Sequence, residues 1–80
     1  MDDKEFKFEV RKHIGVLSEG SKGWRKELNL VSWNEREPKL DIREWSPDHS
    51  MMRKGITLTP EEAKSLHAIL AVYLAEGGRV

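Results

Sequence analysis

The stretch that decides the fold runs from Lys39 to Thr59 and reads KLDIREWSPDHSMMRKGITLT. Residues 39–45 and 53–58 each alternate polar with apolar side chains, and the connection between them contains the sequence Ser-Pro-Asp. Alternation with a period of two is typical of β-strands, because successive side chains point to opposite faces of a sheet. Ser-Pro-Asp favours a turn. The stretch therefore predicts two strands joined by an irregular loop.

Two more alternating runs precede Lys39, and the loop SEGSKG separates them. Gly15 in the first run marks a bend or a bulge. We predict strands over about residues 5–18, 23–34, 38–45 and 52–58, followed by a helix over about residues 60–76. The predicted fold class is α+β, with a four-stranded antiparallel β-sheet and one C-terminal α-helix (ββββα) in a single domain of residues 1–80.

The helix has clear start and stop signals. Thr59 is its N-cap, Pro60 stands at the first helical position, Glu62 completes a capping box, and Gly77-Gly78 ends it. Its apolar stripe is wider than one small sheet needs to cover, and consists of Ala63, Leu66, Ile69, Leu70, Val72, Tyr73 and Leu74. A chain of 80 residues is also short for a stable core, so we expect a second partner surface and a dimer.

Strand periodicity divides the sheet into two unlike faces. We expect a core under the helix made of Leu28, Leu30, Leu40, Ile42, Ile56 and Leu58. The opposite parity then carries Trp33, Lys39, Arg43, Trp45 and Arg53 on an open face. Aromatic rings beside cations suit single-stranded nucleic acid, whose bases stack on rings while its phosphates meet positive charge.

Each of these residues also has a structural interpretation. A tryptophan at a strand end is often a rim residue of the core or a dimer contact, and Trp24 is as compatible with packing as with stacking. Arg43 could form a cross-strand ion pair with Glu27. The cations Lys22, Arg25 and Lys26 could be an ordinary solvated hairpin.

The composition argues against several other classes. Formal net charge is zero, which does not favour bulk electrostatic binding to duplex DNA, and the chain has no cysteine. His13, His49 and His67 lack metal-ligand spacing, and no nucleophile or phosphate-loop motif occurs. We therefore predict no enzyme activity, catalytic residue, metal, cofactor, small-molecule substrate or membrane partner. A cytoplasmic location, with nucleoid association as an option, is expected.

The motifs DIREW and RKGITL, in this order before a capped helix, closely resemble the signature of the transcriptional coactivator family known as positive cofactor four. The segments FKFEVRKHIGVLS and GWRKELNLVSWN make the chain similar to the compact, bacterial YdbC-like branch. The resemblance spans nearly the whole chain. It implies a homodimer that binds single-stranded DNA with little sequence preference, in support of transcription, replication or repair.

The resemblance also implies site residues. Its nucleic-acid-binding positions fall on Lys22, Arg25, Lys26, Trp33, Arg43, Trp45, Arg53 and Lys54. Strand parity adds Lys39, and the position of Trp24 after the glycine loop adds that ring, so we predict these ten residues as the binding site. The family dimerises through its helix and sheet, so we predict that Leu66, Ile69, Leu70, Val72 and Tyr73 of the wide apolar stripe form the dimer interface. The chain lacks the serine-rich acidic arm of the eukaryotic members and carries one aromatic residue after DIRE where they carry two. A protein-interaction module and a single-stranded RNA binder using the same face remain the alternatives. Lys54 has core parity, so it can reach the open face only through its position at the strand end or through a bulge near Gly55.

Overall fold

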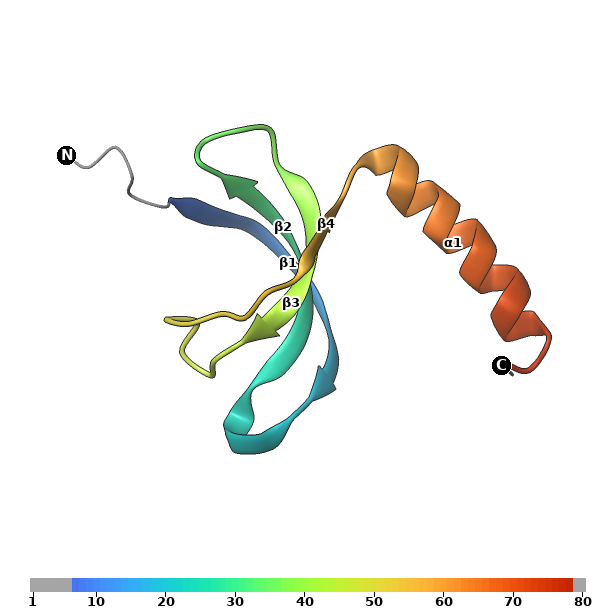
Figure 1. The fold of residues 1–80 in the computed structure, drawn as a ribbon, viewed down its shortest axis with the longest axis horizontal. Helices are drawn as coiled ribbons and strands as arrows, with labels where there is room; N and C mark the ends of the chain where they lie inside the picture. Colours follow the sequence, from blue (N-terminus) through green and yellow to red (C-terminus); the bar gives the residue numbers. More distant parts are fainter. Residues whose placement is uncertain (1–6, 79–80) are drawn as a thin grey trace.

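The computed structural model describes residues 7–78, so Phe6 and the start of the predicted first strand lie outside the described residues. The chain forms one antiparallel sheet in the order β1-β2-β3-β4, followed by a single helix (Figure 1). The elements are β1 (Phe8–Glu19), the 3-10 turn η1 (Ser21–Gly23), β2 (Arg25–Trp33), β3 (Lys39–Trp45), β4 (Ile56–Leu58) and α1 (Pro60–Ala75). The predicted ββββα fold class is confirmed.

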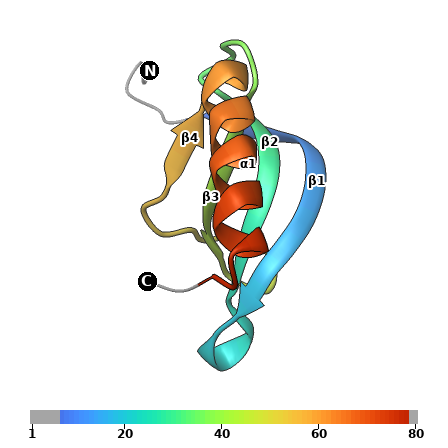
Figure 2. The same ribbon diagram turned by 90° about the vertical axis from the view of Figure 1, so that its right-hand side faces the viewer.

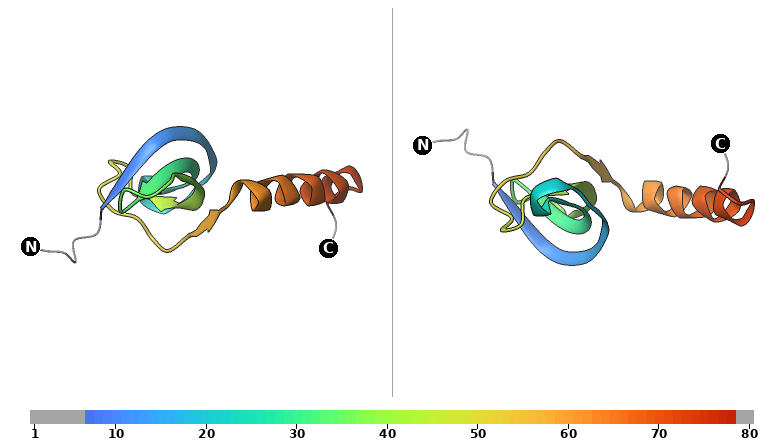
Figure 3. Two further views of the ribbon diagram at one scale, coloured as in Figure 1. Left: turned by 90° about the horizontal axis from the view of Figure 1, so that it is seen from above. Right: turned by 90° about the horizontal axis from the view of Figure 1, so that it is seen from below.

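Strand β1 curves around the rest of the sheet (Figure 3). Its pairing with β2 contains three register shifts, between Val10 and Lys12, between His13 and Gly15, and between Val16 and Ser18. Each shift places an extra residue on β1, which bends the strand and increases its twist. The prediction of an irregularity at Gly15 is confirmed, and the bend brings β1 over one face of its neighbours.

The pairing of β2 with β3 is regular and defines the two faces of the sheet. Arg25 lies opposite Trp45, Glu27 opposite Arg43, Asn29 opposite Asp41, and Val31 opposite Lys39. We call the face that bears these pairs and Trp33 the inner face. The outer face bears Lys26 opposite Glu44, Leu28 opposite Ile42, and Leu30 opposite Leu40. The predicted parities are therefore correct for β2 and β3.

The predicted core, however, is on the wrong face. The most buried side chains of the inner face are Glu27, Asn29, Val31, Asp41 and Trp45, whereas Ser32 is the one such residue with outer-face parity among the described residues of β2 and β3. On the outer face, Leu28, Leu30, Leu40, Ile42 and Leu58 are only half-buried, and Ile56 is 55% exposed. The reason is that the curved β1 covers the inner face, whereas α1 does not cover the outer one.

Helix α1 leaves the end of β4 and runs away from the sheet (Figures 1 and 3), and Figure 2 shows it in front of the strands. Its start is built as predicted: the Thr59 hydroxyl accepts from the Glu62 amide at 3.1 Å, and the Glu62 carboxylate accepts from the Thr59 amide at 2.9 Å. No residue of the helix is buried. The Cα radius of gyration is 14.7 Å, against roughly 12 Å for a compact chain of this length. The expectation that the helix packs on the sheet is thus wrong for a single chain.

Strand β4 begins at Ile56, four positions later than predicted. Before β4, Met52 forms an isolated bridge with Trp45, and the Arg53 amide donates to the Glu44 carbonyl at 3.0 Å. Gly55 then passes so close to β3 that a Cβ added to it would overlap the Ile42 carbonyl oxygen and the Arg43 Cβ. This close approach interrupts the ladder before regular pairing resumes at Ile56.

Candidate nucleic-acid interface

Arg43 and Trp33 lie together on the inner face. The Arg43 guanidinium carbon lies 4.5 Å from the centroid of the Trp33 ring, which is a cation–π arrangement. Its Nε and Nη2 donate to the two carboxylate oxygens of Asp41 at 2.7 and 2.8 Å. Asp41 is fully buried, and only 14% of the Arg43 side chain is exposed. The alternative interpretation, in which Arg43 pairs with Glu27 across the strands, does not hold, because its carboxylate partner is Asp41 on the same strand.

An open hollow of about 600 Å³ adjoins this pair. Its lining consists of Trp33, Arg36, Glu37, Lys39, Arg43 and Thr57. Arg36 and Lys39 are exposed, and neither side chain forms an ion pair with another residue within 7–78. Glu37 supplies the one negative charge at the rim. The hollow therefore combines a half-buried indole with cations whose charge is available to a ligand.

Trp45 does not face outward as expected. It is 1% exposed, its ring centroid lies 5.5 Å from that of Phe8 and 5.4 Å from that of His49, and its indole nitrogen is buried. Phe8 reaches it from β1, because the bend of that strand carries its first residues over the inner face. Trp45 is thus a core residue of this chain, and a base could stack on it only after Phe8 or His49 moved.

Arg53 lies on the outer face, opposite to the prediction. Its Nη1 is 2.7 Å from a carboxylate oxygen of Glu44, and its guanidinium carbon is 4.1 Å from the centroid of the Trp24 ring. The irregular backbone between Met52 and Ile56 causes this reversal, because strand parity holds only along a regular ladder. A second ring and cation pair consequently lies on the opposite face from Trp33 and Arg43.

The remaining predicted cations are divided between the faces. Lys22 is exposed on the η1 turn, where its φ of 59° is in the left-handed region. Arg25 lies on the inner face with its Nη2 3.3 Å from Glu27, and Lys26 is exposed on the outer face. Lys54 is exposed and lines a shallow hollow with Lys26, Glu44 and Ile56. The ten predicted positions thus do not form one continuous surface.

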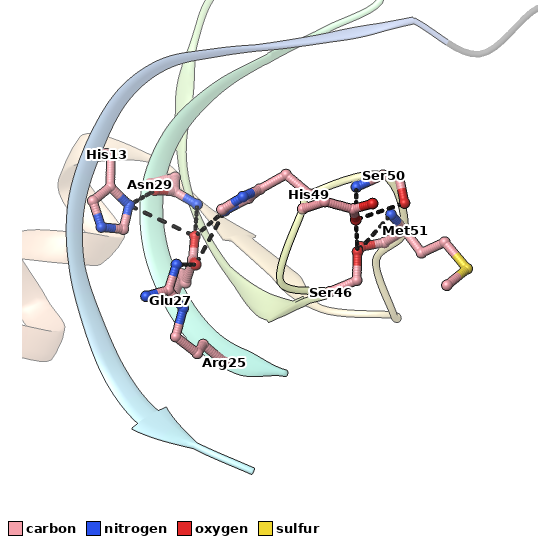
Figure 4. Close-up of polar contacts among 9 residues, drawn as sticks. His13, Arg25, Glu27, Asn29, Ser46, His49, Ser50 and Met51 are labelled. Carbon is pink, nitrogen blue, oxygen red and sulfur yellow. Dashed lines mark hydrogen bonds and ion pairs between the residues drawn. The ribbon is translucent and has the colours of Figure 1, made fainter. Parts of the chain in front are cut away.

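The inner face also carries a polar network around Glu27, whose carboxylate is 1% exposed (Figure 4). His49 Nε2 lies 3.0 and 3.1 Å from its two oxygens, Asn29 Nδ2 donates to it at 3.2 Å, and His13 Nδ1 lies 3.6 Å away. Burial by itself raises the pKa of Glu27, but the hydrogen bonds from His49 and Asn29 and the charges of both histidines outweigh it, so the pKa lies below its ordinary value. Among residues 7–78, no group of three or more side chains has the arrangement of a metal site.

The loop that carries His49 is held by a small hydrogen-bonded turn. Ser46 Oγ and the backbone and side chain of Ser50 all donate to Asp48 at 2.7 to 3.0 Å, which lowers the pKa of Asp48 to about 2. The Met51 amide donates to Ser46 Oγ at 3.0 Å, and the Ser46 amide donates to the Met51 carbonyl at 3.0 Å. These contacts fix the position from which His49 reaches Glu27.

Sequence reasoning missed the acids and amides of the inner face and the cation Arg36. Glu27 and Asn29 share the parity of Trp33, and Asp41 shares that of Arg43, so period two could have placed them beside the predicted site. Arg36 follows Trp33 within the turn NEREP and could have been included on proximity alone. No sequence signal showed that β1 would cover this face.

The chain is a small domain of one four-stranded antiparallel sheet followed by one capped helix, with tryptophan–arginine pairs on the sheet, and the family model that it matches makes it a nucleic-acid-binding domain. Residues 20–69 match the family model described as Transcriptional Coactivator p15 (PC4), and the chain belongs to that family. An uncharacterized protein of Treponema pallidum (strain Nichols) is 48% identical over 66 residues, which cover 82% of this chain and 78% of that protein. The resemblance indicated by DIREW and RKGITL is thereby confirmed, and its bacterial character is supported. Within residues 7–78, no helix is both long and apolar enough to cross a membrane.

Proposed function

We propose that the protein binds single-stranded DNA with little sequence preference and acts as a homodimer in the bacterial cytoplasm. The observation that carries the proposal is the hollow of about 600 Å³ at which Trp33, Arg36, Lys39 and Arg43 meet. A base can stack on the exposed part of the indole while the two cations without ion pairs meet the flanking phosphates. Duplex DNA conceals its base faces and would leave the ring unused.

The proposed roles differ among the residues of the site. Trp33 is the stacking ring, while Arg36 and Lys39 neutralise phosphate. Arg43 holds the indole in place through its cation–π contact and its bidentate pair with Asp41. Trp24 and Arg53, together with Lys22, Lys26 and Lys54, form a second proposed contact region at the η1 end of the sheet. Each stacked base contributes about 1–3 kcal/mol, so two such rings with phosphate contacts support micromolar affinity.

The homodimer is supported by the apolar surface that a single chain leaves uncovered. Leu66, Ile69, Leu70, Val72 and Tyr73 of α1 are 36–65% exposed, and Ile56 is exposed on the outer face of the sheet. A second copy brings the same stripe and the same sheet surface, so one two-fold interface covers both at once. Leu70→Glu is expected to yield monomers in analytical ultracentrifugation, whereas Lys64→Glu, a charge change on the same helix outside the stripe, should leave the dimer intact.

Strand binding is tested by quenching of tryptophan fluorescence. Oligo-dT should quench strongly, and a duplex of equal length should bind weakly. Arg36→Ala combined with Lys39→Ala should lower affinity for oligo-dT at least tenfold and reduce the log-log salt slope by about 1.4, or 0.7 for each lost phosphate contact. The matched control is Lys64→Ala on α1. Equal or stronger binding of the duplex would refute the proposal.

A matched RNA oligomer decides between the two nucleic acids. Stacking and phosphate contacts do not by themselves read the 2′-hydroxyl group, so the ratio of DNA to RNA affinity has to be measured directly. Tighter binding of RNA than of DNA would replace the proposed ligand. Absence of binding to both, with an intact dimer, would favour the interaction module instead.

A further inference from the structure

A second hollow lies on the inner face, at the opposite end of β2 from Trp33. It has a volume of about 330 Å³ and is lined by Val10, His13, Arg25, Asn29 and His49. Arg25, Asn29 and Trp33 share one strand parity, so this hollow opens on the same face as the one beside Trp33. The side chains of His13 and His49 are 50% and 39% exposed, whereas Glu27 beneath them is 1% exposed. A ligand in this hollow therefore meets the two imidazoles and Arg25.

The network beneath the hollow fixes the tautomer of each imidazole. Asn29 Nδ2 donates to Glu27, so its Oδ1 faces His13 Nδ1 at 2.7 Å and can only accept. Nδ1 of His13 therefore carries a hydrogen. His49 Nε2 faces the ionised carboxylate of Glu27, which also only accepts, so Nε2 of His49 carries a hydrogen.

This arrangement leaves one nitrogen on each ring to respond to protons. In the neutral rings, His13 Nε2 and His49 Nδ1 are lone-pair acceptors, and no residue within 7–78 donates to either. Protonation turns both into N–H donors. The formal charge of Arg25, Glu27 and the two histidines then rises from zero to plus two. The hollow thereby changes from a site that does not favour an anion to one that does.

We propose that this hollow is a proton-dependent phosphate site, which binds one backbone phosphodiester of the strand when His13 and His49 are protonated. The proposal rests on the strand binding inferred above. Arg25 supplies a guanidinium fork, which pairs well with phosphate oxygens, and the two imidazolium groups supply further charge-assisted donors. Val10 supplies the apolar wall. A nucleobase fits less well, because every free polar group of the protonated hollow is a donor.

Other charged groups around the hollow are compensated in part or in full. Arg25 of the hollow shares the single Glu27 carboxylate with both imidazoles, so its charge is only partly compensated, whereas on β3 Arg43 is paired with Asp41. On β1, Arg11 is paired with Glu9, and in the loop Asp48 accepts from the hydroxyl and amide groups of Ser46 and Ser50. The net charge of the hollow therefore depends on whether its two imidazoles carry a second proton.

The test measures oligo-dT affinity at about pH 7.5 and about pH 5.5, on either side of the ordinary titration of histidine. Wild type should bind at least tenfold more tightly at the lower pH, because each of the two added charge-assisted hydrogen bonds contributes about tenfold. His13→Gln combined with His49→Gln keeps an amide donor for the network but cannot gain a proton, and its affinity ratio should fall to about one. His67→Gln, on the distant helix, should keep the ratio of wild type.

A second measurement uses the unaltered protein and does not depend on the variants folding. The log-log salt slope of oligo-dT binding should become steeper by about 0.7 from pH 7.5 to pH 5.5, because one more phosphate of the strand is neutralised. An unchanged slope, or an equal affinity ratio in wild type and the double variant, overturns the phosphate site while leaving strand binding in place.

If wild type binds no oligonucleotide at either pH, the proposal of strand binding is refuted. Titration with inorganic phosphate then tests whether the hollow binds phosphate. At about pH 5.5, the imidazole NMR signals of His13 and His49 should shift and saturate with added phosphate, while those of His67 should not. Shifts of equal size at His67 would overturn the site.

Discussion

Replacing Gly55 by alanine tests the packing that links the two halves of the sequence signature. A methyl group at this position would overlap the Ile42 carbonyl oxygen and the Arg43 Cβ, and it would lie 3.0 Å from the Arg43 Cα. Two of these atoms are backbone, so no rotamer change relieves the contact. Gly55 does not have a positive φ, which means that space, and not backbone conformation, requires glycine here.

The expected loss is large for so small a domain. The added methyl must push β4 away from β3, to which it is paired only at Leu58, Thr57 and Ile56. Overpacking costs about 1–3 kcal/mol, and each weakened ladder hydrogen bond about 1 kcal/mol more, so we expect a loss of about 2–4 kcal/mol in the free energy of unfolding. A domain of this size has only about 4–12 kcal/mol in total.

The assay is urea unfolding followed by circular dichroism and tryptophan fluorescence at one fixed protein concentration, because a dimer unfolds in a concentration-dependent way. Gly15→Ala is the matched control. A Cβ at Gly15 meets nothing within 4 Å, so this variant should lie within about 0.5 kcal/mol of wild type. A Gly55→Ala protein as stable as the control, with an unchanged slope on urea, would refute the argument from close approach.

Three further changes test the core, the buried network and the helix cap. Trp45→Ala should lower the free energy of unfolding by about 3–5 kcal/mol in a urea titration, because the ring is a core residue, whereas Trp33→Ala should reduce oligo-dT affinity with a smaller loss of stability. Glu27→Gln should flatten the acid limb of a plot of melting temperature against pH. The pKa of Glu27 is lowered in the folded protein, so its stabilisation is complete above its ordinary pKa of 4.5 and is lost as the pH falls through the lowered value. Thr59→Ala should cost about 1 kcal/mol in a thermal melt, since the hydroxyl accepts from the Glu62 amide.

The elements of the fold were predictable because their signals are local. The capping box at Thr59 and Glu62 depends on residues three positions apart, and it is present in the structure. The irregularity at Gly15 depends on a glycine within an alternating run, and the register shifts there. Side-chain parity along β2 and β3 was predicted correctly for the same reason, since it requires only a regular strand.

Burial was not predictable from the same pattern. Alternation states which residues share a face, but it does not state which face another element will cover. The apolar parity of Leu28 and Leu30 suggested a core beneath the helix, yet in a single chain β1 bends over the opposite face and encloses Glu27, Asn29 and Trp45. The uncovered outer face and helix stripe are what a second copy would have to bury.

Arg53 shows how one irregularity reverses a functional assignment. Counting by twos from Ile56 and Thr57 puts Arg53 on the same face as Arg43. The close passage of Gly55 over β3 breaks that count, and Arg53 instead pairs with Glu44 and stacks on Trp24. The sequence shows that position 55 is a glycine, but it does not show how closely this residue approaches β3.

The signature D-I-R-E and R-K-G is therefore best understood as a packing unit. Asp41 and Arg43 lie two residues apart on one strand, so their side chains share a face and form a bidentate pair against the Trp33 ring. Gly55 fits against the backbone of that same arginine. Because the charge of Arg43 is already balanced by a buried carboxylate, the proposed role of the Asp41–Arg43 pair is to orient the indole, and the pair contributes little attraction to phosphate. The attraction must come from neighbours outside the motif, and on this face Arg36 and Lys39 are the exposed cations that border the ring.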